Sequence, residues 1–351
     1  MKKMNSRFEY KAFSNISGRV LAIHRGRIYV GYKNRLYVSA DDGKTWQFAG
    51  VLPASRLCRY TGISRLCARL LRYEPRALAV SDNGYKLAAT REGIYWADAQ
   101  EIYFHSVQLP NLNRPVYFPM TILADSANRF LWGEYGSNPE RQAVGIFVSS
   151  NGGKLHQLAY EFSAGDVRHI HGLYEDVDKK GFWVATGDKD KESGIGWLSS
   201  DLKDFSWLVR GNQKYRAVSI FVEKDCIIYA TDTETDYNYI YRCDKNSGMV
   251  EKLAEIPGSC IYAAKFGNWY AVSTTVEKFY NFKTNMATLW LSQNGVDWKQ
   301  IWECEKDIWP KKYFQYGSIV LPRSSWQHDK IVFSGQALKE LDNRICIGQP
   351  F

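Results

Sequence analysis

The chain has 351 residues and a net charge of +9, from 46 Lys and Arg against 37 Asp and Glu. Its basic residues are dispersed, without the Lys/Arg runs of a nucleic-acid-binding segment, so we expect no nucleic-acid partner. No apolar run is long enough to cross a bilayer, and we expect no membrane insertion. Aromatic residues make up 15% of the chain, which favours the pleated, half-buried surfaces of β-sheets.

The N-terminus and the cysteines bear on the cellular compartment. The first residues are positively charged but lead into Phe8-Glu9-Tyr10-Lys11 instead of an apolar segment, so they do not predict a signal peptide. The seven cysteines are scattered and form no Cys-x-x-Cys pair, which indicates reduced thiols in a core. The sequence therefore predicts a cytoplasmic protein.

Short apolar strands separated by Gly, Asn, Asp and Ser recur along the chain, and no segment has the pattern of an amphipathic helix. They form a four-strand unit with a period of roughly 40 to 55 residues, as in propeller blades. In chain order, the first strands of the units are expected to begin near Val20, Ala77, Met120, His169, Ala217, Tyr262 and Gly317. The second strands are expected to include residues 28–30, 86–88, 130–132, 182–186, 227–229, 269–271 and 331–333.

Two segments fall outside this repeat. Residues 8–13 precede the first unit and have the pattern of a strand, and the seventh unit ends in a weak outer strand. An N-terminal strand that completes the last blade closes the ring and hides both edges. Residues 51–72 are irregular and are expected to be an insertion between blades. The sequence therefore predicts an all-β fold, with one domain over 1–351 that is a seven-bladed β-propeller of four-stranded antiparallel blades, closed by the N-terminal strand.

A second repeat occupies the turn between the third and fourth strands. Ser39-Ala40-Asp41-Asp42-Gly43-Lys44-Thr45-Trp46 has the pattern Ser-x-Asp-x-Gly-x-Thr-Trp, and degenerate copies begin at Ser149, Ser199 and Ser292. In such a turn the Asp or Asn caps backbone N–H groups, Gly takes a positive φ, and Trp packs between sheets. We therefore expect these turns to be structural and not catalytic.

This motif is the Asp-box, and on its four copies the chain resembles the Asp-box (BNR repeat) sialidase-like β-propeller superfamily over nearly its whole length. That superfamily includes sialidases, other glycoside hydrolases and non-enzymatic binding propellers. The resemblance therefore implies a propeller fold and a carbohydrate substrate. The chain departs from the sialidases in lacking Arg-Ile-Pro near the N-terminus, where the nearest fragment is Phe118-Pro119-Met120.

Propeller topology predicts which residues meet. The loop after each second strand lies on the same face as the start of the next blade's first strand, opposite the Asp-box turns. The loops over 133–138, 187–192, 231–239 and 277–285 are rich in acids, amides and aromatics, as functional loops on a rigid scaffold are. Arginines recur where first strands begin, namely Arg19, Arg76, Arg114, Arg168 and Arg216.

His169 and His171 are the most specific feature of this face. Because they are two residues apart on a strand, both side chains lie on one side of it. With Glu134 and Asp188 on adjacent loops, one imidazole is a candidate general base or acid. Imidazoles and carboxylates also suit Zn or Mn, so a divalent metal at His169 and His171 is an alternative, although the pattern requires no cofactor. A hydrogen-bonded structural pair is the third interpretation.

The candidate catalytic residues are His171, Asp188, Glu134, His169 and Tyr239, of which Tyr239 supplies a phenol. Guanidinium groups bind carboxylates in bidentate fashion, which suits an acidic sugar. The candidate substrate-binding residues are Arg168, Arg216, Tyr135, Asn138, Asp190, Glu192, Asp232 and Asn238.

Three functions fit these residues, each with an acidic oligosaccharide or polysaccharide as partner. The first is a glycoside hydrolase in which protonated Asp188 or Glu134 donates to the leaving oxygen. The second is a polysaccharide lyase in which Arg168 or Arg216 neutralises a uronic acid and His171 or a tyrosine removes the C5 proton. The third is a non-catalytic glycan-binding or interaction propeller.

Overall fold

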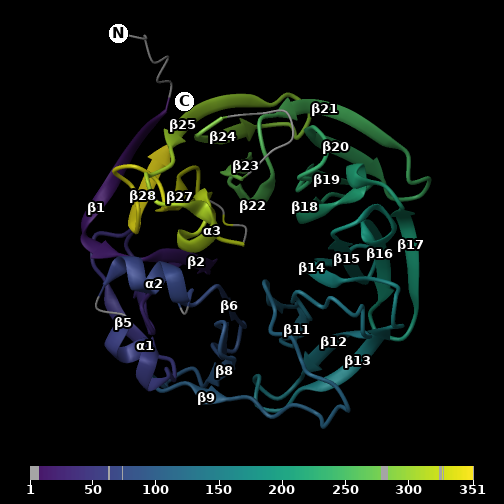
Figure 1. Ribbon diagram of the computed structural model, residues 1–351, viewed down its shortest axis with the longest axis horizontal. Helices are drawn as coiled ribbons and strands as arrows, with labels where there is room; N and C mark the ends of the chain where they lie inside the picture. Colours follow the sequence, from purple (N-terminus) through teal and green to yellow (C-terminus); the bar gives the residue numbers. More distant parts are fainter. Residues whose placement is uncertain are drawn as a thin grey trace.

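The protein is described by a computed structural model, which covers residues 8–61, 64–72, 74–277, 284–323, 326 and 328–350. Antiparallel sheets surround a common centre, and each four-stranded sheet has its first strand innermost and its last strand at the rim (Figure 1). This arrangement confirms the predicted all-β propeller architecture. It also means that the starts of the first strands gather around the central channel.

Five sheets have four strands each, paired in chain order. The first two are β2 (Arg19–His24), β3 (Arg27–Tyr32), β4 (Arg35–Ser39) and β5 (Gln47–Val51), then β6 (Ala77–Val80), β7 (Lys86–Ala89), β8 (Ile94–Ala97) and β9 (His105–Ser106). The third is β10 (Leu123–Ala124), β11 (Phe130–Gly133), β12 (Val144–Ser149) and β13 (Gln157–Phe162). The fourth and fifth are β14 (His169–Asp176), β15 (Gly181–Gly187), β16 (Gly194–Ser199) and β17 (Phe205–Arg210), then β18 (Ala217–Val222), β19 (Cys226–Thr231), β20 (Asn238–Asp244) and β21 (Val250–Ile256).

The remaining strands form one eight-stranded sheet, because β23 pairs with β26 as well as with β22 and β24. Its first part is β22 (Cys260–Phe266), β23 (Trp269–Val276), β24 (Met286–Ser292) and β25 (Lys299–Glu305). Its second part is β26 (Gly317–Val320), β27 (Ile331–Gln336), β28 (Arg344–Gln349) and the N-terminal β1 (Glu9–Ser17). Glu9 lies opposite Gln349, so the N-terminal segment pairs antiparallel with the last strand of the chain.

The second strands are largely buried, and β15 and β19 are buried along their whole length. Both faces of each sheet pack against neighbouring sheets, so these strands consist of apolar and small residues. Trp132 and Trp183 are the largest of the fully buried side chains. A packed core between sheets holds the channel-facing strands rigid.

The helices are a difference from the sequence prediction. The irregular segment between the first two sheets contains α1 (Arg56–Thr61) and α2 (Arg65–Leu71), and α3 (Lys311–Phe314) lies beside α2 near the centre of the ring (Figure 1). Arg69 is buried between them, where it pairs with Asp307 at 2.5 Å and donates to the carbonyl of Phe314. Helices this short depend on such tertiary contacts, which no sequence periodicity reveals. Two 3₁₀ turns, η1 (Asp190–Glu192) and η2 (Gln213–Tyr215), complete the described elements.

The turn after β4 has the hydrogen bonds expected of its motif. Asp41 accepts from the amide of Thr45 at 2.9 Å and from its hydroxyl at 2.6 Å, and Ser39 accepts from the amide of Gly43 at 2.8 Å. Gly43 has a φ of 79°, and the Trp46 indole donates to its carbonyl at 3.1 Å. All of these bonds are internal to the turn, which is consistent with a structural role.

Candidate functional site

Three neighbouring elements bring the histidines and Asp188 together. His169 and His171 stand at the start of β14, Asp188 directly follows β15, and the loop after β11 adds Tyr135. A Cβ atom at Gly187 would lie 2.4 Å from Cε1 of His171, so only glycine lets the backbone before Asp188 approach this ring. The predicted meeting of these side chains at one end of the channel-facing strands is therefore present.

The His169–His171–Asp188 cluster has three converging atoms. Nε2 of His169 lies 3.0 Å from Nε2 of His171 and 3.1 Å from Oδ1 of Asp188. Nε2 of His171 lies 3.5 Å from the same Oδ1. The two imidazoles are buried, and the Asp188 side chain is 21% exposed.

The outer nitrogens of both rings fix which atoms carry hydrogen. Nδ1 of His169 donates to the carbonyl of Gly136 at 2.8 Å, and Nδ1 of His171 donates to the carbonyl of Ala217 at 2.8 Å. In neutral rings this leaves both Nε2 lone pairs facing each other and a carboxylate oxygen. Three acceptors at such distances need a positive charge among them, either a shared proton or a metal ion. Backbone carbonyls that orient the outer nitrogen are also the usual support of metal-binding histidines, so the donor set fits a divalent cation.

Burial decides the protonation of His171. Because the ring is buried, the pKa of His171 is lowered to about 4, and the charges of His169 and Arg216 act in the same direction against the opposing effect of Asp188. The ring is neutral at pH 7, so its Nε2 is an acceptor there. This state suits either a proton acceptor or a metal ligand.

Asp188 is held in its ionised form. Arg168 donates to its Oδ2 at 2.6 Å, and Arg216 lies 3.2 Å from its Oδ1. Burial alone would raise the pKa of Asp188, but a proton shared with His169 and His171 and the charge of Arg216 together hold it far below its usual range. Asp188 therefore fits an anchor for cations and not the protonated acid that the hydrolase hypothesis requires. The two arginines are correspondingly engaged by the protein itself.

Tyr135 connects this cluster to the central cavity. Its ring packs on His169 with centroids 4.4 Å apart. Burial and the charges of Asp232 and Asp188 raise the pKa of the Tyr135 phenol above its ordinary value, so the phenol is protonated at pH 7. Within the described part of the chain its hydroxyl makes no hydrogen bond, which leaves it free for a ligand.

Two carboxyl groups near Arg216 have raised pKa values. Burial raises the pKa of Asp232 to about 6, with Arg216 opposing and Asp188 and Glu234 adding to the shift. Burial and the charges of Asp232 and Glu234 raise the pKa of Glu277 to about 8. Asp232 also lies 3.4 Å from Arg216. Both carboxyl groups therefore keep their protons to a higher pH than an ordinary carboxyl group does.

Glu134 and Tyr239 have other partners. The carboxylate of Glu134 binds Arg114 at 2.8 Å and the amides of Tyr117 and Gly145 at 2.9 and 2.7 Å, so both of its oxygens are occupied. The ring of Tyr239 lies under the ammonium of Lys252 at 3.5 Å, on the third strand of its sheet. Neither residue has a contact with the histidine cluster among the described interactions. The sequence could not reveal this, because it places a residue on a loop or strand without its partners.

Four candidate binding residues hold the loops in shape. Asn138 donates to the carbonyls of Gln142 and Arg168 at 3.0 Å each, and Asn238 accepts from the amide of Thr233 at 2.9 Å. Glu192 pairs with Arg141 and accepts from the amide of Lys189, and Asp190 accepts from Gln213 at 3.0 Å. These bonds position the loops that end at Arg168 and Asp188. Of the predicted loop 277–285, residues 278–283 lie outside the described residues.

A basic cavity lies above the channel beside Tyr135. We call it the vestibule; its volume is about 590 Å³ and its polar lining is Arg19, Arg72, Glu74, Arg76, Arg91, Tyr135, Tyr262, Lys312, Tyr313, Gln315 and Arg323. Arg19 and Arg76 were expected here from their positions at the start of first strands. Arg72 directly follows α2, and Lys312 lies within α3. Their contribution to the vestibule therefore depends on helices that the sequence did not predict. Arg91, Tyr262 and Arg323 had no motif to identify them.

Comparisons with known proteins give the fold. No protein-family model matches the chain. No curated protein matches it either. Among solved structures, the extracellular domain of the hybrid two-component system BT4673 from B. thetaiotaomicron has a TM-score of 0.60 and 14% identity, over 99% of this chain and 43% of that chain.

Two carbohydrate-active enzymes are also similar in structure. An oligogalacturonate lyase in complex with manganese has a TM-score of 0.64 and 7% identity, over 98% of this chain and 96% of that chain. The GH74 enzyme of Niastella koreensis has a TM-score of 0.52 and 14% identity, over 83% of this chain and 46% of that chain. The chain thus spans less than half of BT4673 and of the GH74 enzyme. At these identities the likeness shows the propeller fold.

The cytoplasmic prediction is corrected by these comparisons. Two of the solved structures that share the fold are extracellular domains, at TM-scores of 0.60 and 0.55. The reasoning from cysteines fails because five of the seven free cysteines are buried, and a buried thiol packs as a small apolar group in either redox compartment. Among the described residues, no helix has the length and apolarity needed to span a membrane.

Proposed function

We propose that this chain binds an acidic glycan in the vestibule and cleaves it by elimination next to a uronic acid. The observation behind the proposal is the contact of Tyr135 with both parts of the site. Its ring packs on His169 and also lines the basic cavity. A ligand in that cavity therefore meets the phenol and the cation-binding cluster together.

The charge of the vestibule supports an anionic ligand. The acidic residue of its described lining is Glu74, which pairs with Arg65 at 2.7 Å and so leaves the arginines around it uncompensated. Guanidinium groups bind carboxylates in a two-pronged geometry and stabilise charge that develops on them. Neutralising a uronate carboxylate makes its C5 proton more acidic, which is the first requirement of an elimination.

A divalent metal ion fits the cluster, as its converging lone pairs indicate. Nε2 of His169, Nε2 of His171 and Oδ1 of Asp188 would hold it, and these atoms all lie within 4.8 Å of one another. When bound, such an ion supplies Lewis-acid polarisation of an anionic oxygen. The manganese in the oligogalacturonate lyase structure belongs to that protein and lends the idea support by analogy.

Tyr135 is the proton carrier that we assign to the elimination. As the C4–C5 double bond forms, its phenol gives a proton to the leaving O4 and its oxygen takes the C5 proton, so the phenol is regenerated. Its phenol is protonated at pH 7 because burial and nearby acids raise the pKa. The hydroxyl is free of hydrogen bonds to the described residues and lies at the wall of the cavity. A positioned donor of this kind typically contributes about 100-fold or more to a rate.

Elimination is favoured over hydrolysis by the state of the two acids that a hydrolase would need. Asp188 is held ionised by two histidines and Arg216. Glu134 is tied to Arg114 and two amides. Hydrolysis is the second candidate because Glu277, with a pKa of about 8, keeps its proton at pH 7, while Asp232, with a pKa of about 6, is mostly ionised there. A hydrolase would use these two groups.

We also propose that the chain is a single seven-bladed domain over 1–351 of the Asp-box (BNR repeat) type. In this interpretation the eight-stranded sheet is two blades, β22–β25 and β26–β28 with β1. The pairing of β1 with β28 supports closure by the N-terminal strand. The hydrogen bonds of the Asp41 turn support the Asp-box assignment.

The test is a panel of polygalacturonate, alginate, hyaluronan and a neutral control glucan. Each is incubated with the protein alone, with MnCl₂ and with EDTA. Elimination produces an unsaturated uronide that absorbs in the short-wavelength ultraviolet, with one new reducing end for each double bond. Reducing ends without absorbance would establish hydrolysis, and binding without either product would establish a non-catalytic propeller. Cleavage of the neutral glucan alone would refute the acidic-substrate proposal.

A further inference from the structure

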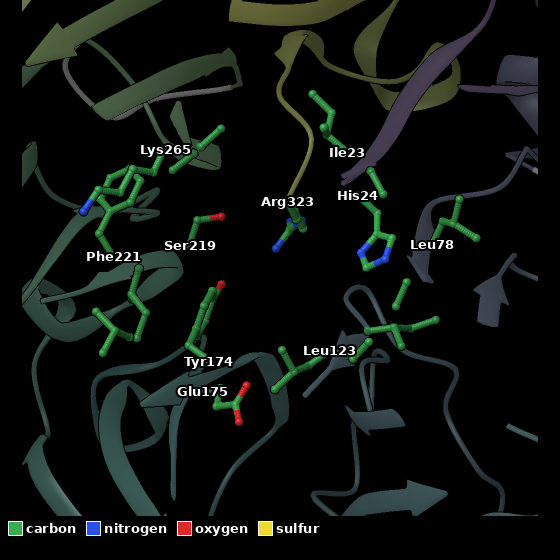
Figure 2. Close-up of a pocket in the computed structure, with 18 of the residues that line it drawn as sticks. Ile23, His24, Leu78, Leu123, Tyr174, Glu175, Ser219, Phe221, Lys265 and Arg323 are labelled. Carbon is green, nitrogen blue, oxygen red and sulfur yellow. The ribbon is translucent and has the colours of Figure 1, made fainter. Parts of the chain in front are cut away.

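The central channel narrows between two cavities. Above the constriction lies the vestibule, and below it lies a cavity of about 440 Å³ at the far ends of the first strands. The constriction itself has a volume of about 10 Å³ and a polar lining of Arg19, Arg76, Tyr262 and Arg323. Arg323 lines all three spaces. In the view of the lower cavity its side chain lies near the centre, between Ser219 and His24 (Figure 2).

The three arginines of the constriction have neutral partners. Arg19 donates to the Tyr262 hydroxyl, Arg76 donates to the carbonyl of Phe118 at 2.5 Å, and Arg323 donates to the carbonyl of Ile261 at 3.2 Å. Within the described part of the chain none of them forms a salt bridge. Nε of Arg76 and Nη1 of Arg323 are buried there without any hydrogen-bond partner.

These guanidinium groups also lie close to one another. Arg19 and Arg323 each lie 5.5 Å from the centroid of the Tyr262 ring. Burial lowers the pKa of Arg76 to about 10, and the charges of Arg19 and Arg91 act in the same direction. Partly buried cations that repel one another and keep unused, buried N–H groups are costly unless a counter-charge joins them. The other residues that line the constriction are apolar, and they supply none.

We propose that Arg19, Arg76 and Arg323 bind one compact oxyanion at the mouth of this constriction, where all three line the vestibule. Planar guanidinium forks match the paired oxygens of carboxylate, phosphate or sulfate. The constriction itself has room for about one water molecule, so the ion lies at its mouth, where the same three arginines line the larger vestibule. The ligand is therefore a free ion or the anionic group of a molecule held in the vestibule. This site goes beyond the proposed cleavage, and its occupancy does not depend on turnover.

Calorimetric titration of the intact protein with sodium phosphate, sodium sulfate and sodium galacturonate, in a chloride buffer of low ionic strength, tests the site. We expect a dissociation constant of about 1 mM or tighter for at least one of them. Arg323→Met and Arg76→Met should each weaken binding about tenfold or more, since each removes a charged fork. Arg35→Met, at an exposed arginine on β4, is the matched control and should bind as the wild type does.

A second measurement keeps the test independent of folding losses. Without oxyanion, Arg323→Met should melt at or above the wild-type temperature, because it relieves the repulsion. Phosphate or sulfate should raise the melting temperature of the wild type and of Arg35→Met but not of Arg323→Met. Response to the inorganic ions identifies a free-ion site, and response to galacturonate alone identifies a sugar carboxylate. No binding of any of the three, or equal weakening in Arg35→Met, would overturn the proposal while leaving the cleavage assay unaffected.

Discussion

Nε2 of His169 and Nε2 of His171 face each other at 3.0 Å, while the opposite nitrogen of each ring donates to a backbone carbonyl. The backbone therefore aims two lone pairs at one point, and Asp188 adds a carboxylate oxygen there. Such an arrangement favours the binding of a proton or a metal cation between these three atoms. It is the feature on which the first prediction depends.

Divalent metal should bind at this cluster and stabilise the fold. We expect MnCl₂ or ZnCl₂ to raise the melting temperature of the wild type, because a ligand that binds the folded state stabilises it by mass action. His171→Gln should abolish the shift. His156→Gln is the control, since His156 is also buried but bonds Trp132 and Gly153 away from the cluster. A metal response retained in His171→Gln would contradict the assignment.

Asp188→Asn should destabilise the protein. The substitution removes the charge that Arg168, Arg216 and the two histidines share. Breaking a buried ion network leaves its cations unpaired, and we expect a loss of about 2–4 kcal/mol in the free energy of unfolding at pH 7. Urea unfolding measures it. Asp190→Asn, two residues further along the same loop, should cost much less. Equal losses would mean that the ion network of Asp188 contributes little.

Tyr135→Phe should reduce turnover without unfolding the protein. The hydroxyl makes no hydrogen bond among the described residues, so its loss removes no internal contact, while the ring still packs on His169. We expect kcat on the best acidic glycan to fall about 100-fold, with a melting temperature close to that of the wild type. Tyr37→Phe, whose ring packs on Phe48 in the first sheet, is the matched control. An unchanged kcat would remove Tyr135 from the reaction.

Stability should decline as pH rises from about 7 to 9. Below pH 7 the lowered pKa of His171, about 4, acts in the opposite sense, because the unfolded imidazole binds a proton there that the folded one does not. The folded state holds the Asp232 and Glu277 protons more tightly than the unfolded state, because burial raises their pKa values to about 6 and 8. Their stabilisation is full below the unfolded pKa values, near 4, and is lost as pH rises through the folded ones. Unfolding in urea across this range measures the decline.

Two variants separate these groups from the rest of the protein. Glu277→Gln should flatten the upper part of the decline and melt above the wild type at pH 9. Glu255→Gln, at an exposed position on β21, should leave the profile unchanged. A wild-type stability that rises from pH 7 to 9 would contradict the raised pKa of Glu277.

The strands themselves could be predicted from the sequence. The second strand expected over 182–186 is β15 (Gly181–Gly187), and the one expected over 227–229 lies within β19 (Cys226–Thr231). Apolar, β-branched and aromatic runs between turn residues determine such elements locally, because burial on both faces requires them. The repeat of these runs then fixed the order of the sheets. From that order alone, the meeting of His169, His171 and Asp188 could be anticipated.

Only the tertiary structure decided what each polar group does. Asp188 and Glu134 are both acids on loops of the same face, but Asp188 faces the histidines and Glu134 is neutralised by Arg114. The vestibule depends on α2 and α3, which are held by the buried Arg69–Asp307 pair across 238 residues of sequence. Protonation and charge pairing are set by neighbours in space, since desolvation and Coulomb interactions depend on distance and burial and leave no periodic trace in the chain.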